Sequence, residues 1–172
     1  MYGNIEYATI LTRTATFAAL ISIGGWISIV VPFLPLVPFT LQTLFLLLAA
    51  LVMKRYALFP AALYIVLGVC NLPVFHNGTA GLGVLLGPTG GYIIGFLPAA
   101  LVAGIICEHT FRHSKITGII SASIIIYIFG SAWLSLSTGM PFTAAVVVGV
   151  LPFIPGDILK GIAALAIARR IT

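Results

Sequence analysis

The chain has 172 residues and is 61% hydrophobic, yet only 6% of its residues are charged and its mean hydropathy is +1.23. Soluble domains carry roughly 25% charged residues, so this composition excludes a water-soluble fold and indicates an integral membrane protein. The net charge of +5 does not indicate nucleic-acid binding, because the eight basic residues are scattered in ones and twos. Continuous apolar runs favour spanning helices over a β-barrel, so we predict an all-α fold.

Prolines, glycines and basic residues divide the apolar sequence into six predicted membrane-spanning helices. Three prolines follow the first helix within positions 32–38, and proline cannot continue a regular helix. The longest irregular stretch, residues 73–90, is rich in glycine and contains no Lys, Arg, Asp or Glu. We expect one membrane domain, residues 1–172, with spans over about residues 14–31, 41–53, 56–72, 91–107, 116–136 and 142–168.

The basic residues fall at alternate ends of the predicted spans. The connections on the other side, residues 32–40, 73–90 and 137–141, carry no charged residue. Because basic residues concentrate in cytoplasmic loops, this pattern predicts six spans with both termini in the cytoplasm. We therefore expect a multi-pass protein of the cell membrane, embedded in the lipid bilayer. Its cytoplasmic side would carry Arg13, Lys54, Arg55, Arg112, Lys115, Arg169 and Arg170.

Asp157 and Lys160 are ionisable residues inside the last apolar segment. Counting back from Arg169 along a helix places them roughly 18 and 14 Å from the cytoplasmic face. Ionisable groups at that depth are costly and commonly mark a ligand or ion path. At positions i and i+3 they share one helix face, so they could also form a purely structural ion pair. Pro155 and Gly156 could break the helix and leave Asp157 as the N-cap of a half-helix, a recurrent way to build a ligand site.

A second group of candidate ligand contacts is neutral and lies on the uncharged side. The run Gly87-Pro-Thr-Gly-Gly91 lets the backbone approach a ligand closely, but it lacks the lysine of a phosphate-binding loop. Uncharged amide, hydroxyl and aromatic side chains suit a neutral ring with N–H and C=O edges. Each of them could equally be a loop residue satisfied by the backbone. The candidates are Gln42, Asn71, Phe75, His76, Asn77, Thr89 and Tyr92.

Small residues recur at helical spacing in two of the predicted spans. Ala15 and Ala19 form such a pair in the first span, and the fourth span repeats the pattern with Gly91, Gly95, Ala99 and Ala103. Small residues four positions apart let two helices approach closely. These faces therefore predict either packing within the bundle or contact with a partner subunit.

No catalytic or metal site is predicted. Ser131 has no histidine within any span that could activate it. Glu108, His109 and His113 lie among basic residues at a helix end, where cations complement the helix C-terminus. The sequence also lacks a nucleotide-binding motif. We therefore expect a protein that is not an enzyme, holds no metal or cofactor, and depends on partner subunits for any ATP hydrolysis.

Four segments together resemble the BioY family, the biotin-specific substrate-binding (S) components of energy-coupling-factor (ECF) transporters. The resemblance extends over nearly the whole chain, with the motifs in order and at consistent spacing. The segments are Val37-Pro-Phe-Thr-Leu-Gln42, Leu72-Pro-Val-Phe75, the glycine-rich run over residues 81–96, and Pro152-Phe-Ile-Pro-Gly-Asp-x-x-Lys160.

The resemblance implies a bundle of six helices that binds biotin from outside the cell. It also implies uptake with a transmembrane coupling protein and two cytoplasmic ATP-binding subunits. Ala15 and Ala19 match the family's Ala-x-x-x-Ala pattern, which implies that they contact the coupling protein. Asp157 and Lys160 match the motif that is implicated in ligand binding.

The chemistry of biotin fits these residues. Its ureido ring offers two N–H donors and one carbonyl, which suit Asp157 together with an Asn or Gln amide. Its thiophane ring and alkyl tail suit an apolar pocket with Tyr92 or Phe75, and its carboxylate suits Lys160. Which charged residue meets which end of the ligand stays open at this point. The alternative is a self-sufficient proton-linked carrier or channel in which Asp157 titrates; its uptake would collapse with the proton gradient and ignore ATP depletion.

Overall fold

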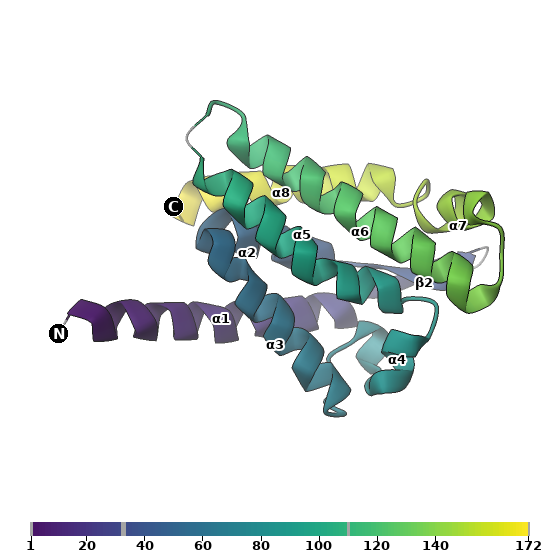
Figure 1. The fold of residues 1–172 in the computed structure, drawn as a ribbon. Helices are drawn as coiled ribbons and strands as arrows, with labels where there is room; N and C mark the ends of the chain where they lie inside the picture. The colour runs from purple at the N-terminus through teal and green to yellow at the C-terminus, as the bar shows by residue number, and fades with distance from the viewer. Residues whose placement is uncertain (1, 32–33, 110, 172) are drawn as a thin grey trace.

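Apolar helices make up most of the fold and lie alongside one another (Figure 1). The computed structural model describes residues 2–31, 34–109 and 111–171. Pro32 and Phe33 of the predicted proline-rich connection lie outside these residues. The helices are α1 (Tyr2–Trp26), α2 (Gln42–Met53), α3 (Leu58–Val69), α4 (Leu82–Leu86), α5 (Gly90–Glu108), α6 (Ser114–Thr138), α7 (Phe142–Gly149) and α8 (Ile154–Ile171), with 3-10 turns η1 (Lys54–Ala57) and η2 (His76–Gly78).

Within the described residues, four helical stretches are long and apolar enough to cross a membrane: Glu6–Trp26, Gln42–Val69, Gly90–Glu108 and Ser114–Thr138. The pair α7 and α8, bent by 52° at the break between them, is a fifth candidate. The predicted number of six spans therefore stays a prediction.

The stretch Gln42–Val69 reverses direction rather than running straight. Lys54, at its middle, has φ of 57°, and the side-chain amide of Gln42 donates a hydrogen bond to the Tyr64 hydroxyl. A straight helix would hold these two residues about 33 Å apart, at 1.5 Å per residue. α2 and α3 are therefore two separate helices that fold back on each other, and each has 12 residues.

A short β-hairpin follows α1 and differs from the prediction that the first helix continues to residue 31. α1 ends at Trp26, and β1 (Ser28–Val31) pairs antiparallel with β2 (Leu34–Thr40), Ile29 facing Phe39. Two causes are visible in the sequence. Residues 29–31 are β-branched and prefer extended backbone, and the prolines of β2 lack the N–H that a helix needs.

Glycine allows α5 and α6 to pack closely, as the small-residue pattern of the fourth span predicted. A Cβ atom at Gly91 would lie 2.2 Å from the Cβ of Trp133, and one at Gly95 would lie 3.0 Å from the Cβ of Phe129. Ala99 and Ala103 continue this buried face of α5. The pattern on α5 therefore serves packing within the bundle.

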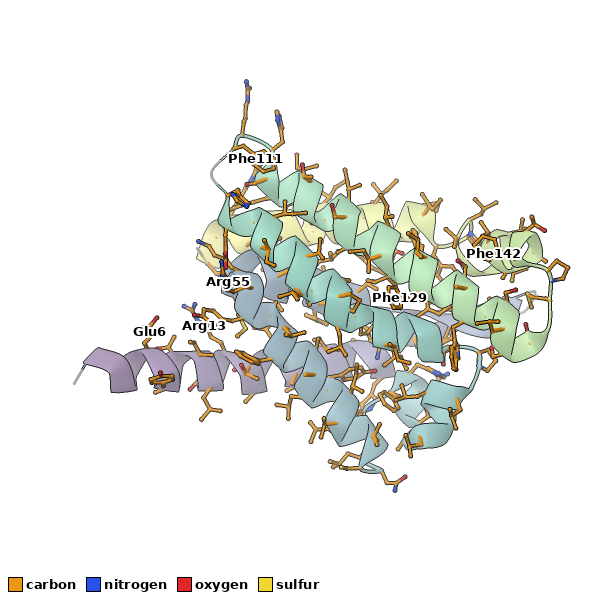
Figure 2. All side chains as sticks on the ribbon, in the orientation of Figure 1. Glu6, Arg13, Arg55, Phe111, Phe129 and Phe142 are labelled. Atoms are coloured by element: carbon orange, nitrogen blue, oxygen red, sulfur yellow. The ribbon has the colours of Figure 1, made fainter. Side chains whose placement is uncertain are left out.

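One end of the molecule collects the helix ends that carry basic residues. α1 begins and α8 ends at this end, and Arg13 and Arg55 lie there in Figure 2, whereas Phe142 lies at the other end. The Arg55 Nε donates to both Glu108 carboxylate oxygens, at 2.7 and 2.9 Å, and so ties η1 to the end of α5. This arrangement agrees with the predicted alternation of loops; which end is cytoplasmic stays a prediction.

Candidate functional site

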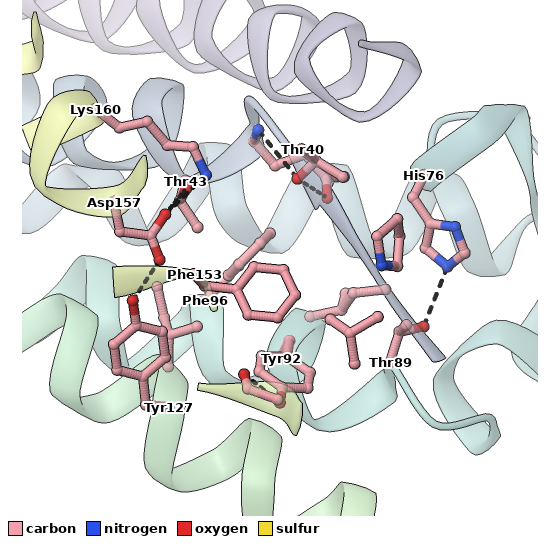
Figure 3. A pocket seen from close by; sticks show the side chains of 16 residues that line it. Thr40, Thr43, His76, Thr89, Tyr92, Phe96, Tyr127, Phe153, Asp157 and Lys160 are labelled. Atoms are coloured by element: carbon pink, nitrogen blue, oxygen red, sulfur yellow. Dashed lines mark hydrogen bonds and ion pairs between the residues drawn. The ribbon is translucent and has the colours of Figure 1, made fainter. Parts of the chain in front are cut away.

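A narrow pocket lies between the β-hairpin and helices α2, α5, α6 and α8 (Figure 3). Its walls are mainly apolar and aromatic, and they include Val37, Tyr92, Phe96 and Phe153. Of the described residues that line it, only Asp157 and Lys160 carry a charge. The cavity volume is about 60 Å³, which is the volume of about two waters in the liquid at roughly 30 Å³ each.

Asp157 is the best-connected group in the pocket. One carboxylate oxygen, Oδ1, accepts hydrogen bonds from the Lys160 Nζ at 2.7 Å and from the Thr43 hydroxyl at 3.4 Å. The other, Oδ2, accepts one from the Tyr127 hydroxyl at 2.5 Å. The side chains of Lys160 and Asp157 are 7% and 13% exposed, so the ion pair is largely removed from solvent. Sequence reasoning found the pair but missed Thr43 and Tyr127.

The start of α8 explains why Asp157 stands here. The chain breaks between Gly149 and Ile154, so the break contains Pro152, one of the two prolines expected to interrupt the last span, and it ends before Pro155 and Gly156. Asp157 lies inside the first turn of α8 and not at the N-cap position, which corrects that prediction. Proline is tolerated in a first turn because its missing N–H would have no helical partner there. A carboxylate in that turn is also stabilised by the positive end of the helix dipole.

Phe39 of the hairpin holds Lys160 from the other side. The Lys160 Nζ lies 3.8 Å from the centre of the Phe39 ring, a cation–π contact. The same ring stacks on Phe153 with centroids 6.1 Å apart. It occupies space that a side chain at Gly156 would need, because a Cβ there would lie 2.1 Å from the ring. The lysine therefore has an ion partner and an aromatic cover.

The opposite side of the pocket is polar but neutral (Figure 3). His76 of η2 and Thr89, the residue before α5, place Nε2 and the hydroxyl oxygen 3.2 Å apart. Thr89 is 8% exposed. The other ring nitrogen of His76, Nδ1, is buried and has no hydrogen-bond partner among the described residues. Burial lowers the pKa of His76 below its usual value, so the imidazole is neutral at pH 7.

Gln42 and Tyr92 also line the pocket, as predicted for ligand contacts, but their polar atoms have partners within the protein. The Gln42 amide accepts from the Thr40 hydroxyl at 3.1 Å and donates to Tyr64. The Tyr92 hydroxyl donates to the Gly149 carbonyl at 2.8 Å. Both side chains therefore line the pocket, and their polar groups form hydrogen bonds within the protein.

The structure does not bring three other predicted residues to the pocket. Phe75 is fully buried behind it, edge-on to Tyr64 with centroids 5.4 Å apart. Asn77 bonds to the Ser28 hydroxyl at the surface, and Asn71 is exposed with φ of 65°. Both asparagines adopt left-handed backbone in the loop, a role in which Asn is common. Their contact with a ligand stays a prediction.

The predicted partner face on α1 is exposed in the part of the chain that the structure describes. Ala15 and Ala19 are exposed, whereas Thr14, Phe17 and Ala18 on the opposite side are buried. The first half of α1 also projects away from the other helices (Figure 1).

Comparisons with known proteins agree on one family. The BioY family model matches residues 3–172. The biotin transporter BioY of Thermotoga maritima is 40% identical over 164 residues, which cover 94% of each chain. A probable biotin transporter BioY of Pyrococcus horikoshii is 38% identical over 162 residues, again 94% of each.

A solved structure has the same fold. The crystal structure of the S-component for biotin from an ECF-type ABC transporter matches with a TM-score of 0.87 and 29% identity, covering 98% of this chain and 93% of that one. These matches confirm the resemblance read from the motifs and, with the apolar helices, a multi-pass helical membrane protein. They also confirm the prediction that the protein is not an enzyme, since the relatives are transporters.

Proposed function

The chain belongs to the BioY family, and we propose that it is the biotin-binding subunit of an ATP-driven uptake system in the cytoplasmic membrane. One observation carries the proposal. The pocket sets an Asp157–Lys160 ion pair at one side, aromatic walls in the middle, and the neutral His76–Thr89 pair at the other side.

Biotin has the matching sequence of chemical groups. Its ureido ring and its carboxylate are polar and stand at opposite ends of the molecule, and its thiophane ring and alkyl tail are apolar. Phe96, Phe153 and Tyr92 offer apolar area to the middle of such a ligand. Because the cavity volume is only about 60 Å³, we expect the side chains that line the pocket to move apart when biotin enters.

The energy for uptake would come from other subunits, because the sequence has no nucleotide-binding motif. We propose a transmembrane coupling protein and two cytoplasmic ATP-binding subunits as partners. The exposed Ala15 and Ala19 would form the docking face, because small residues let a partner helix approach closely.

Calorimetric titration of the detergent-purified chain with biotin tests the ligand and the site together. We expect tight one-to-one binding, and a loss of about 100-fold or more in Asp157→Asn, because that change leaves the buried Lys160 without its counter-ion. Glu108→Gln is the matched control, since it removes a carboxylate that pairs with Arg55 outside the pocket. The absence of biotin binding by the folded wild type would refute the proposal.

A proton-linked carrier is the competing function, with Asp157 as the titrating group. Uptake by cells that produce the chain alone or with the partner subunits separates the two. Biotin uptake that stops on ATP depletion supports the coupled system. Uptake by the chain alone that stops when a protonophore collapses the proton gradient supports the carrier.

A further inference from the structure

A second cavity, a groove between α6 and α8, lies on the surface of the bundle behind the ligand pocket. Its volume is about 330 Å³, several times that of the pocket. Asp157 and Tyr127 line both cavities, so these two side chains form the wall between them. The groove faces outward, because only 28% of the residues in the apolar part of α6 are buried, against 56% in α5.

The groove suits an apolar occupant. Seven of its lining residues are isoleucines, and its polar groups already have partners within the protein. The Ser123 hydroxyl donates to the Ile119 carbonyl at 3.1 Å, and the Tyr127 hydroxyl donates to Asp157 at 2.5 Å. Asp157 also accepts from Lys160. A polar solute would lose its hydrogen bonds to water here without replacement, whereas a hydrocarbon chain has none to lose.

The length of the groove matches one leaflet of a bilayer. Ile116 and Tyr127 line it on α6 and lie 11 positions apart, as do Ile154 and Leu165 on α8. At 1.5 Å per residue, each pair spans about 17 Å. Half of a hydrocarbon core about 30 Å thick is about 15 Å. The groove therefore extends from one surface of the hydrocarbon to near its middle, which is the reach of one acyl chain.

Two basic residues stand at the outer end of the groove. Lys115 precedes Ile119 by four positions on α6, and Arg169 follows Leu165 by four on α8, so each shares a helix face with a groove residue. The start of α6 and the end of α8 lie at the same end of the molecule (Figure 1). Both cations are exposed, and neither forms an ion pair within the part of the chain that the structure describes. Basic residues between membrane helices at this level favour an anionic headgroup.

A helix of another protein, or of a second copy, fits the groove less well. Helices associate in membranes chiefly through small residues that let their backbones approach. The one glycine among the described residues of the groove, Gly161, already faces α6, since a Cβ there would lie 3.1 Å from the Ile119 Cγ2. The branched isoleucines have few rotamers, so the groove keeps its shape and a flexible chain can adapt to it.

We propose that the groove binds one anionic phospholipid from the leaflet on the side of the basic residues. Its acyl chain lies between α6 and α8, and its phosphate lies near Lys115 and Arg169. The proposal does not depend on which ligand the pocket takes. Because Asp157 and Tyr127 form the common wall, the acyl chain packs against the back of the ligand pocket.

Native mass spectrometry of the delipidated full chain in detergent tests the headgroup site, with phosphatidylglycerol and phosphatidylcholine of identical acyl chains as probes. We expect phosphatidylglycerol to bind roughly tenfold or more tighter, because each basic residue near a membrane surface contributes about a fivefold gain for an anionic lipid. Lys115→Gln and Arg169→Gln should each lose roughly fivefold for phosphatidylglycerol and leave phosphatidylcholine unchanged. Arg13→Gln is the matched control, an exposed cation on α1 that does not line the groove.

Filling the groove tests the site of the acyl chain. Ser123→Phe and Ile162→Phe should lose the bound lipid, whichever headgroup it carries, because the new ring takes the space of the chain. Ile128→Phe is the matched control, since Ile128 is exposed on α6 and does not line the groove. Melting temperatures in detergent verify that these variants are folded. The two glutamine variants change only exposed side chains, so they test the proposal even if a filled variant does not fold.

Three outcomes would overturn the proposal. The first is equal affinity of the wild type for the two lipids, or glutamine variants at Lys115 and Arg169 that bind phosphatidylglycerol as Arg13→Gln does. The second is lipid binding by folded Ser123→Phe and Ile162→Phe that equals that of the control. The third is a wild-type dimer in light scattering that Ser123→Phe converts to a monomer, which would assign the groove to a second copy of the chain.

Discussion

The ring of Phe39 covers the ammonium group of Lys160, with Nζ 3.8 Å from the ring centre. The two residues lie far apart in the sequence, one on the β-hairpin after α1 and the other on the last helix. The contact joins the β-hairpin, which the sequence analysis did not predict, to the Asp157–Lys160 pair, which it did predict. It also makes the position of Lys160 depend on the hairpin.

Replacing Phe39 with leucine should weaken biotin binding roughly threefold to thirtyfold, because the cation–π contact is lost next to a largely buried lysine. Phe39→Tyr keeps the aromatic face and should retain most of the affinity. Phe142→Leu serves as the matched control, since Phe142 is 55% exposed at the start of α7. Titration calorimetry on the three variants measures the effect, and equal affinity in Phe39→Leu and the control would contradict it.

The tight fit of Phe39 against Gly156 predicts a second effect. Gly156→Ala should push the Phe39 ring away, since its new Cβ would lie 2.1 Å from the ring, and destabilise the protein by about 1–3 kcal/mol. Gly83→Ala is the control, because a Cβ at Gly83 meets no atom within 4 Å. Thermal unfolding in detergent would show a lower midpoint for Gly156→Ala alone; equal midpoints would mean that the ring adjusts at no cost.

Tyr127 positions the Asp157 carboxylate in the pocket. Its hydroxyl donates to Asp157 Oδ2 at 2.5 Å, so Tyr127→Phe should weaken biotin binding about tenfold or more while keeping the ring in place. Tyr56→Phe provides the control, since Tyr56 is exposed in η1 and does not line the pocket. If Tyr127→Phe and Tyr56→Phe bind biotin with equal affinity, the hydrogen bond from Tyr127 to Asp157 does not contribute to binding.

His76 predicts a pH dependence of the stability of the protein. Burial holds its pKa below the usual 6.5, so the unfolded chain binds the proton more readily and the ligand-free protein loses stability as the pH falls below that value. Thermal unfolding of the ligand-free wild type and of His76→Asn in detergent from pH 7.5 to pH 5 measures the effect, and equal losses of stability in the two proteins would contradict it.

The exposed alanines of α1 predict a separation of binding from transport. Ala15→Leu and Ala19→Leu should leave biotin affinity unchanged, since neither residue lines the pocket, and should reduce co-purification with the coupling partners and biotin uptake by cells. Ala166→Leu is the control, because Ala166 is an exposed alanine on α8. Unchanged uptake in both α1 variants would place the docking face elsewhere.

Several structural features were predictable from the sequence because their causes are local. The apolar runs and their prolines, glycines and basic residues predict the ends of α5 and α6 closely, at Gly90–Glu108 and Ser114–Thr138. The close packing of Gly91 and Gly95 follows from the spacing of small residues on one helix face. The Asp157–Lys160 pair follows from its i, i+3 spacing.

The surroundings of that pair were not predictable in the same way. Thr43 lies 114 positions from Asp157 in the sequence, and Tyr127 lies 30 positions from it on another helix. No periodicity or motif within one segment brings such residues together. The β-hairpin was missed for a related reason, since an apolar run of β-branched residues satisfies the criteria for a spanning helix as well as those for a strand.

The sequence by itself determined the membrane class, the family resemblance and the charged pair, because hydropathy, motif order and helical spacing are properties of contiguous residues. Only the tertiary structure decided which neutral residues share the pocket with that pair. It placed Gln42, Thr89, Tyr92 and His76 around the cavity and left Asn71 and Asn77 at the surface. The physical reason is that hydrogen bonds between distant segments, such as that of His76 with Thr89, depend on how the helices pack and not on the residues between them.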